Sequence, residues 1–291
     1  MAWNEGIVKQ PRIATIQDFS CFGRCSLTVA LPIISASGVE VCGIPSAVLS
    51  THTGGFNGYT FRDLTDDIPK ITDHWQKLGL FFDVIYTGYL SSSRQIELVE
   101  NFIDVFAVKE TTVIIDPAMA DGGSLYSGFD SVFAARMARL CARADIVIPN
   151  LTEAAMITNE SYDPHPDKNR VQKLLNLLVE RGARNAVITG VSLEEGFLGA
   201  VAYGERCSET AYEFARAVEG YYHGTGDIFS SVVAAATARE LSLRSAVRAA
   251  VEFTSLCIQK THDTRCDVRG GVRFEQCIGQ LEGLFQESEK N

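Results

Sequence analysis

Short apolar runs alternate with longer stretches of helical periodicity along the whole chain of 291 residues. Short apolar runs rich in β-branched residues favour buried strands, and apolar residues spaced three or four apart favour helices. The first pattern predicts strands at residues 12–17, 39–49, 83–87, 112–116, 145–149 and 186–189, with a weaker pair at 198–203 and 210–215. The second pattern predicts helices at residues 26–37, 61–80, 92–108, 131–142, 167–181, 227–240, 243–260 and 273–287.

This alternation predicts one central sheet. Continuous apolar strands such as residues 113–115 and 146–148 suit a sheet that is covered on both faces. Strands that alternate with helices indicate right-handed βαβ units and therefore mainly parallel pairing. The last two strands, joined by residues 204–209, resemble an antiparallel hairpin at one edge. Because the chain has no Pro/Gly/Ser-rich linker and no repeat, we expect a single domain over residues 1–291, with its core at about 12–287.

Composition and net charge argue against several classes of protein. The chain is 46% hydrophobic and 21% charged, which is an ordinary globular balance, and its formal net charge is −10. A negative field of this size opposes binding to nucleic acid or to an anionic membrane surface. The first twelve residues do not resemble a signal peptide, and no apolar run reaches the roughly 18 residues that span a bilayer. Eight scattered cysteines are typical of reduced thiols, so we expect a cytoplasmic protein.

Polar residues cluster after the predicted strands. In an open α/β sheet, ligands bind beyond the carboxyl ends of the strands, so these residues are candidates for a site. They are Asp18 and Ser20, His52 and Thr53, Thr87 and Tyr89, Asp116 and Asp121, Asn150 and Glu153, and Thr189. Cys21 and Cys25 also lie here, but no second Cys/His pair follows at zinc-finger spacing, so we assign them to packing.

A glycine-rich turn before the helix at 227–240 is the sharpest chemical signal. Gly224 and Gly226 allow backbone N–H groups to point inward at a helix N-terminus, where the helix dipole favours negative charge. Such a turn suits a phosphoryl group in transfer, whose charge is spread over three oxygens. Asp227 follows at once and is placed to take a proton from an attacking hydroxyl. Asp227 as a plain helix N-cap remains the alternative.

Five motifs in register resemble ribokinase-like kinases, and in particular the pyridoxal/pyridoxamine kinase branch. They are the Gly-Thr-Gly-Asp at 224–227, the Asp-Pro-Ala-Met-Ala-Asp at 116–121, the Pro-Asn-Leu-Thr-Glu at 149–153, the Ser-Thr-His-Thr-Gly at 50–54 and the Thr-Gly-Tyr at 87–89. The resemblance runs from about residue 12 to 260. It implies a ribokinase-like three-layer α/β/α sandwich without a lid domain, and ATP-dependent phosphorylation of the 5′-hydroxymethyl group of a B6 vitamer.

The resemblance also implies roles for residues. Asp227 would be the general base, and the backbone of Gly224, Thr225 and Gly226 would hold the transferring phosphoryl group. The remaining roles are Mg²⁺ binding by Asp116, Asp121 and Glu153, ATP contacts by Asn150, Thr189, Asp116, Thr225 and Gly226, and substrate contacts by Asp18, Ser20, His52, Thr53, Tyr89 and Asp227. A monovalent cation such as K⁺ is a further expected cofactor, and a homodimer is the expected assembly.

Two positions depart from the branch, and several rival functions stay open. Many pyridoxal kinases carry serine where this chain has Asp18, and Ala120 replaces a glycine of the acidic loop. The leading rival is a hydroxymethylpyrimidine kinase of thiamine synthesis. A non-catalytic ligand-binding protein on the same fold is a second rival, and a sugar kinase is disfavoured because no Gly-Gly motif or lid insert is visible. The sequence also lacks the glycine motifs of Walker-type ATPases and of Rossmann dehydrogenases.

Overall fold

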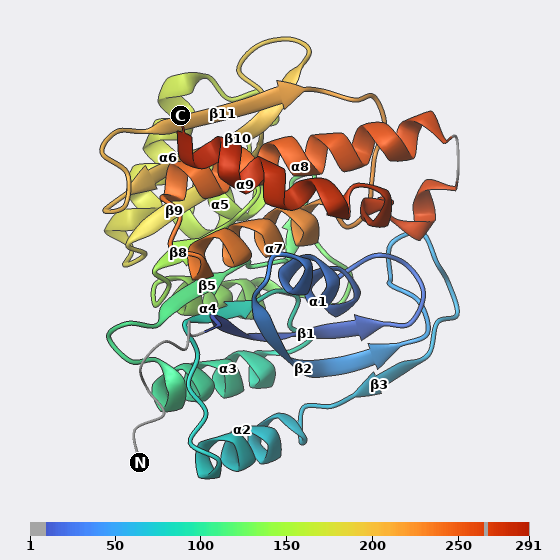
Figure 1. Ribbon diagram of the computed structural model, residues 1–291, viewed down its shortest axis with the longest axis vertical. Coiled ribbons are helices and arrows are strands. Elements are labelled where there is room, and N and C mark those ends of the chain that lie inside the picture. The colour runs from blue at the N-terminus through green and yellow to red at the C-terminus, as the bar shows by residue number, and fades with distance from the viewer. Residues whose placement is uncertain (1–9, 265–266, 291) are drawn as a thin grey trace.

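A sheet of nine strands runs through the protein in the order β11-β10-β9-β8-β5-β4-β1-β2-β3 (Figure 1). The computed structural model describes residues 10–264 and 267–290. The strands of this sheet are β1 Arg12–Ser20, β2 Glu40–Leu49, β3 Phe61–Asp63, β4 Val84–Thr87, β5 Thr112–Ile115, β8 Ile146–Val147, β9 Asn185–Val191, β10 Phe197–Gly204 and β11 Ala211–Arg216. A separate small hairpin joins β6 Ala120–Asp121 to β7 Ser124–Leu125.

The centre of the sheet is parallel and its edges are antiparallel. Strands β9, β8, β5, β4, β1 and β2 pair in parallel, so their carboxyl ends lie along one edge of the sheet. Strands β10 and β11 form the antiparallel hairpin predicted at one edge, and β3 pairs antiparallel with β2 at the other. The predicted three-layer α/β/α sandwich with a mainly parallel sheet is therefore confirmed.

Helices cover both faces of the sheet. They are α1 Leu27–Ala36, α2 Ile68–Lys77, α3 Ser93–Phe106, α4 Ser131–Cys141, α5 Leu151–Thr158, α6 Lys168–Glu180, α7 Thr225–Ala238, α8 Leu243–Asp263 and α9 Leu281–Lys290. Apolar residues of α1, α7 and α8 share one core with one face of the strands, and those of α2 to α6 share the core on the other face. Adjacent strand residues alternate between these cores, as Ile13 and Ala14 of β1 do.

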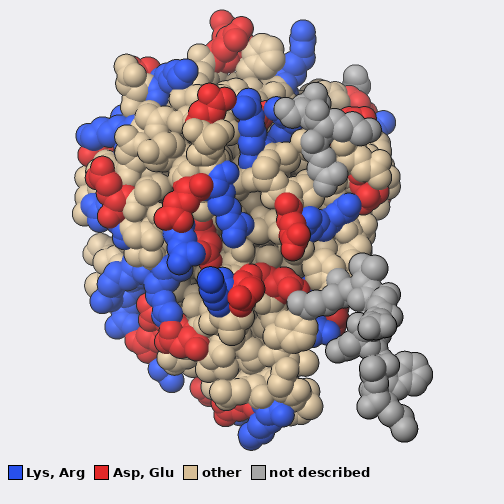
Figure 2. Space-filling model, turned by 60° about the vertical axis from the view of Figure 1, so that its left-hand side comes forward, with Lys and Arg blue, Asp and Glu red and all other residues tan. Residues whose placement is uncertain are grey.

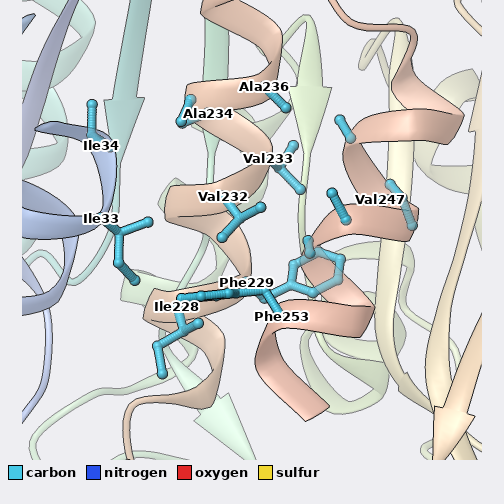
Figure 3. Close-up of a cluster of buried hydrophobic side chains, with 14 of the residues drawn as sticks. Ile33, Ile34, Ile228, Phe229, Val232, Val233, Ala234, Ala236, Val247 and Phe253 are labelled. Atoms are coloured by element: carbon cyan, nitrogen blue, oxygen red, sulfur yellow. The ribbon is translucent and has the colours of Figure 1, made fainter. Parts of the chain in front are cut away.

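Helix α7 lies between α1 and α8 (Figure 3). Its small residues, such as Ala234 and Ala236, are fully buried and let the neighbouring helices approach closely. Ile33 of α1 lies on one side of the helix and Val247 of α8 on the other (Figure 3). This packing fixes the N-terminus of α7, where the glycine-rich turn is located, against the rest of the protein.

The structure differs from the prediction in three helical regions. The predicted helix at 61–80 begins only at Ile68, because Phe61–Asp63 forms the edge strand β3. The predicted helix at 273–287 is two short 3₁₀ turns, Phe274–Gln276 and Ile278–Gln280, followed by α9. Helix α5 was not predicted, because its eight residues are too few to show a periodic pattern. In the first of these regions, pairing with the distant strand β2 decides the local structure.

Charged residues of both signs intermingle on the surface in Figure 2. Ion pairs such as Arg170 with Glu160 and Arg184 with Asp145 account for part of this mixing. Within the described residues, no helix has both the length and the apolar character needed to cross a membrane. The predicted absence of a signal peptide concerns the first twelve residues, and residues 1–9 lie outside the described part of the chain.

Candidate active site

The glycine-rich turn forms the N-terminus of α7. Gly224 caps this helix with φ of 82° in the left-handed region. A Cβ atom at Gly224 would lie 2.1 Å from the backbone oxygen of Arg24, so a side chain fits neither the conformation nor the space. Gly226 is exposed, and a Cβ there would meet no atom within 4 Å. The turn therefore presents backbone groups at a helix N-terminus, as an anion site requires.

Asp227 stands in the first turn of α7, beside this glycine-rich turn, and its side chain is half-buried. Burial, together with the carboxylates of Asp116 and Asp18, raises the pKa of Asp227 to about 8. A carboxyl group whose pKa lies near neutral pH accepts a proton effectively, which is what a general base needs. Gly224 is the N-cap, so the alternative assignment of Asp227 as a plain N-cap does not hold.

Asp116 and Glu153 lie buried behind Asp227. Ser230 donates a hydrogen bond of 2.7 Å to Asp116 Oδ2, and the Ala118 amide donates one of 3.2 Å to Oδ1. Glu153 accepts from the amides of Met119 at 2.8 Å and Ala120 at 3.3 Å through Oε1, and from that of Asn150 at 2.9 Å through Oε2. Asn150 in turn caps α5 by accepting from the Glu153 amide at 3.0 Å, which completes a capping box.

Among the described residues, no basic side chain forms an ion pair with Asp116 or Glu153. Burial raises the pKa of Asp116 to about 6. Burial and the charge of Asp116 together raise the pKa of Glu153 to about 8. A bound cation would stabilise the ionised form of both groups, because an opposite charge nearby lowers a carboxyl pKa. Carboxylate oxygens are also the ligands that Mg²⁺ prefers, so these two residues fit a magnesium ion.

Asp121 is separated from these two carboxyl groups. It is exposed, and it accepts hydrogen bonds from the hydroxyl of Tyr221 at 3.0 Å and from the Gly122 amide at 2.8 Å. Among residues 10–264 and 267–290, no three His, Cys, Asp or Glu side chains are grouped closely enough to hold a metal ion. The three carboxylates predicted to bind Mg²⁺ are thus not assembled into a direct ligand set. The arrangement fits an ion that keeps water and nucleotide oxygens as its other ligands.

Asp18 and Ser20 come together where β1 ends, and both are buried. The hydroxyl of Ser20 donates a 3.0 Å hydrogen bond to Oδ2 of Asp18. Burial raises the pKa of Asp18 despite this bond. Tyr89 is half-buried, and burial together with the charge of Asp18 raises its pKa to about 12. These residues form an acidic, partly aromatic end of the site.

His52 is held by backbone groups. Its Nδ1 accepts from the Gly54 amide at 3.1 Å, so Nε2 carries the proton and donates to the Arg269 carbonyl at 2.6 Å. Both ring nitrogens therefore have partners, and only the ring face remains to contact a substrate. Thr53 is exposed. The predicted substrate contact of His52 is thus restricted to stacking.

A chain of ring contacts extends from His52 across three loops. Its ring centroid lies 5.0 Å from that of Phe56 and 5.1 Å from that of His223. Phe56 contacts Phe22 at 5.8 Å, and His223 contacts Tyr221 at 5.1 Å. None of these partner residues belongs to the five motifs, although His223 directly precedes Gly224. The others are single aromatics in loops, which no spacing distinguishes.

Asn150 lies beyond the end of β8 and is joined by an isolated bridge to Thr189, which lies within β9. Asn150 also donates a 2.7 Å hydrogen bond to the Ala120 carbonyl through Nδ2. Thr225 makes a long contact of 3.5 Å from its hydroxyl to the Tyr222 carbonyl. Most of the predicted site residues therefore meet at one edge of the sheet, with Asp121 and Thr53 at its exposed margin.

Comparison with known proteins identifies the family. Residues 76–270 match the family described as phosphomethylpyrimidine kinase. A crystal structure described as a candidate phosphomethylpyrimidine kinase from Bacteroides thetaiotaomicron is 36% identical, with a TM-score of 0.91 over 94% of each chain. A pyridoxal kinase from Lactobacillus plantarum is 30% identical, with a TM-score of 0.87 over 96% of this chain and 99% of that one.

Curated relatives extend this similarity. The pyridoxine kinase of Bacillus subtilis is 28% identical over 265 residues, which are 87% of this chain and 85% of that one. The thiamine biosynthetic bifunctional enzyme of Arabidopsis thaliana is 23% identical, and the chain spans only 49% of its length. The fold and these similarities agree with each other and with the motifs. This chain belongs to the family of pyridoxal and phosphomethylpyrimidine kinases, which have the ribokinase-like fold.

Proposed function

We propose that this protein uses ATP to phosphorylate the 5′-hydroxymethyl group of a B6 vitamer, which is pyridoxamine, pyridoxal or pyridoxine. The observation that carries this proposal is the position of Asp227. A carboxyl group with its pKa raised to about 8 stands beside a glycine turn at a helix N-terminus. A proton acceptor next to an anion site is the pair of groups that phosphoryl transfer to an alcohol requires.

The reaction follows from this pair. Asp227 takes the proton of the substrate's hydroxymethyl group. The oxygen of that hydroxyl group then attacks the γ-phosphorus of ATP. The bond between the γ-phosphorus and the bridging oxygen breaks, and ADP leaves with that oxygen. The backbone of Gly224, Thr225 and Gly226 stabilises the charge on the equatorial oxygens, and the dipole of α7 adds to this effect. Asn150, just beyond β8, and Thr189, on the neighbouring strand β9, would contact the other phosphates.

Asp116 and Glu153 would hold Mg²⁺ on the nucleotide through its water ligands, and Asp121 would add negative charge from the exposed side. The metal supplies charge neutralisation for the phosphate groups. We also propose that a monovalent cation such as K⁺ supports the site. What supports this is the raised pKa of the two buried carboxyl groups, whose ionised forms need positive charge.

We favour a B6 vitamer over a pyrimidine as the substrate because of relatives with higher sequence identity. The Bacteroides protein, 36% identical, has also been crystallised with pyridoxal. The relatives named hydroxymethylpyrimidine/phosphomethylpyrimidine kinase, from Streptomyces coelicolor and Bacillus subtilis, are 25% identical. The latter relatives and the matched family keep hydroxymethylpyrimidine as the second candidate. Both substrates are flat heteroaromatic alcohols that suit the aromatic rings around His52.

A substrate panel tests the proposal directly. Pyridoxal, pyridoxine, pyridoxamine and hydroxymethylpyrimidine are each incubated with the protein, ATP and Mg²⁺, and the phosphorylated product is quantified by chromatography. We expect kcat/KM to be highest for a B6 vitamer and to fall strongly in Asp227→Asn for every substrate. A higher kcat/KM for hydroxymethylpyrimidine would identify this compound, and not a B6 vitamer, as the substrate. The absence of product from all four compounds would refute the kinase activity.

We further propose that the protein acts in the cytoplasm. In support, the cysteines of the described residues are all unpaired thiols, as in a reducing compartment. Three of them, Cys141, Cys257 and Cys277, are buried in the core. The eighth cysteine, Cys266, lies outside the described residues.

A further inference from the structure

A short segment after α8, residues 269–275, hydrogen-bonds to loops that form the site, and we call it the clamp segment. The carbonyl of Arg269 accepts a 2.6 Å hydrogen bond from Nε2 of His52, on the loop between β2 and β3. The amide of Val272 donates a 3.2 Å hydrogen bond to the carbonyl of His223, directly before the glycine-rich turn. The clamp segment therefore connects the aromatic side of the site with the N-terminus of α7.

Arg24, on the loop between β1 and α1, makes a third connection to the clamp segment. Its backbone amide donates a 3.2 Å hydrogen bond to the carbonyl of Gly270. Its guanidinium donates to the same carbonyl at 3.1 Å through Nη1, and its Nε pairs with Oε1 of Glu275 at 2.6 Å. Both the backbone and the side chain of Arg24 are thus bound to the clamp segment.

The backbone of Arg24 also lies directly against the glycine-rich turn. A Cβ atom at Gly224 would lie 2.1 Å from the carbonyl oxygen of Arg24, so the turn packs on this peptide group. Gly271 of the clamp segment has φ of 79°, and a Cβ atom there would lie 2.9 Å from the same oxygen. Two glycines with positive φ therefore allow the turn and the clamp segment to approach one peptide group closely.

The clamp segment is itself fixed to the core. Val272 and Phe274 are buried in the core that α1, α7 and α8 share. The amide of Arg273 donates a 2.8 Å hydrogen bond to Oγ1 of Thr261, on α8. Because well-packed core residues move little, the clamp segment provides a rigid support for the loops that it contacts.

We propose that Arg24 is a positioning residue for phosphoryl transfer. Its guanidinium ties the loop after β1 to the clamp segment, and its backbone supports the glycine-rich turn at Gly224. The ion pair with Glu275 adds little stability in itself, because the two side chains are 31% and 50% exposed. The inference rests on the proposed function for its catalytic consequence, but the contacts do not depend on which alcohol is phosphorylated.

Arg24→Ala is the decisive variant. It loses both guanidinium contacts and keeps the hydrogen bond from its backbone amide to Gly270, so it should fold. Misplaced donors of the glycine-rich turn stabilise the transition state less. We therefore expect kcat to fall roughly 10-fold while KM for ATP stays nearly unchanged.

Arg239, just beyond the last residue of α7, offers a matched control. Its guanidinium also joins a backbone carbonyl, that of Ser37, to a glutamate, Glu282. Arg239→Ala should lower the melting temperature about as much as Arg24→Ala and leave kcat unchanged. Equal kcat values in Arg24→Ala and the wild type, or equal losses of kcat in Arg24→Ala and Arg239→Ala, would overturn the proposal.

Glu275→Gln separates position from charge. The amide oxygen of glutamine still accepts a hydrogen bond from Nε of Arg24, and the contact of Arg24 with Gly270 is unaltered. We expect kcat to stay close to the wild-type value. A loss of kcat as large as that in Arg24→Ala would show that charge, not position, is responsible, and it would also overturn the proposal.

A second measurement needs no substrate. Amide hydrogen exchange, followed by NMR, reports local opening of the backbone. The amides of residues 223–227 should exchange faster in Arg24→Ala than in the wild type, and at the wild-type rate in Arg239→Ala. Equal exchange in all three proteins would contradict the positioning role. If the wild type phosphorylates no substrate of the panel, the proposed function fails, and amide exchange alone decides whether Arg24 positions the turn.

Discussion

The hydroxyl of Ser230 donates a 2.7 Å hydrogen bond to Oδ2 of Asp116, across 114 residues of sequence. Ser230 belongs to the same helix as Asp227, and Asp116 begins the loop that leads to Ala120 and Asp121. The bond therefore fixes the proposed base relative to the proposed metal-binding carboxylates. Phosphoryl transfer requires this fixed relation, because the attacking oxygen and the phosphorus must be aligned.

Removing the base should affect turnover far more than nucleotide binding. We expect Asp227→Asn to lower kcat by roughly 10² to 10⁴, the range for loss of a general base. The dissociation constant for ATP, measured by calorimetry, should change little because the glycine turn is unaltered. A variant within a few-fold of the wild-type turnover would show that proton removal is not the role of Asp227.

The activity should depend on pH through Asp227. Burial and the charges of Asp116 and Asp18 raise its pKa to about 8, and only the ionised form accepts a proton. kcat/KM should therefore rise as pH increases and level off above about pH 8. In Asp116→Asn one of the negative charges is gone, so the pKa of Asp227 falls and the rising limb should move to lower pH. Initial rates from pH 5 to 10 give the pH profiles of the wild type and of Asp116→Asn. If both profiles rise over the same pH range, the charge of Asp116 does not affect the pKa of Asp227.

Asp121 offers a clean test of the magnesium proposal because it is exposed. Asp121→Asn should need a higher Mg²⁺ concentration for half-maximal rate, since one fixed negative charge near the ion is lost. Glu153→Gln should also need a higher Mg²⁺ concentration for half-maximal rate. Its thermal stability should be lower as well, because the Glu153 carboxylate accepts hydrogen bonds from three backbone amides. If both variants keep the wild-type dependence of the rate on Mg²⁺, then Asp121 and Glu153 have only a structural role.

Asp18 should distinguish among the vitamers. Pyridoxamine carries an ammonium group near neutral pH, and a charge-assisted hydrogen bond to Asp18 would favour it over the neutral vitamers. We expect Asp18→Ser to reduce kcat/KM for pyridoxamine selectively, by about 1–3 kcal/mol in transition-state free energy. Equal losses for all three vitamers would indicate a shared ring contact instead. Unchanged kinetics with a lower melting temperature would reduce Asp18 to a structural acid held by Ser20.

We expect the protein to form a homodimer in solution. The edge strand β3 and the loop before it expose Tyr59 and Phe61, and Phe22 is exposed on the loop after β1. Exposed aromatic residues close to a site suit an interface between copies. Sedimentation equilibrium at micromolar concentration measures the mass directly. A monomer would end this prediction without bearing on the kinase activity.

Periodicity predicted the elements that a long uniform pattern specifies. The helices at 92–108 and 243–260 correspond to α3 and α8, and the apolar strands correspond to the parallel centre of the sheet. It was wrong at residues 61–67, where Phe61 pairs with Leu49 of β2 rather than starting a helix. Strand pairing depends on a partner that lies elsewhere in the chain, and a local pattern carries no information about it.

The site residues also divide into those that the sequence predicted and those that only the structure revealed. The glycine turn and its aspartate were found from sequence because positive φ, a helix N-terminus and a carboxylate must be adjacent in the chain to form an anion site with a base. The separation of Asp121 from Asp116 and Glu153 and the backbone bonds that hold both nitrogens of His52 were not visible there. The sequence by itself determined the fold class, the family and the chemistry of the first turn of α7. Only the tertiary structure decided which acids share a buried environment, because burial and charge coupling depend on neighbours that lie far apart in the chain, such as Asp116 and Asp227.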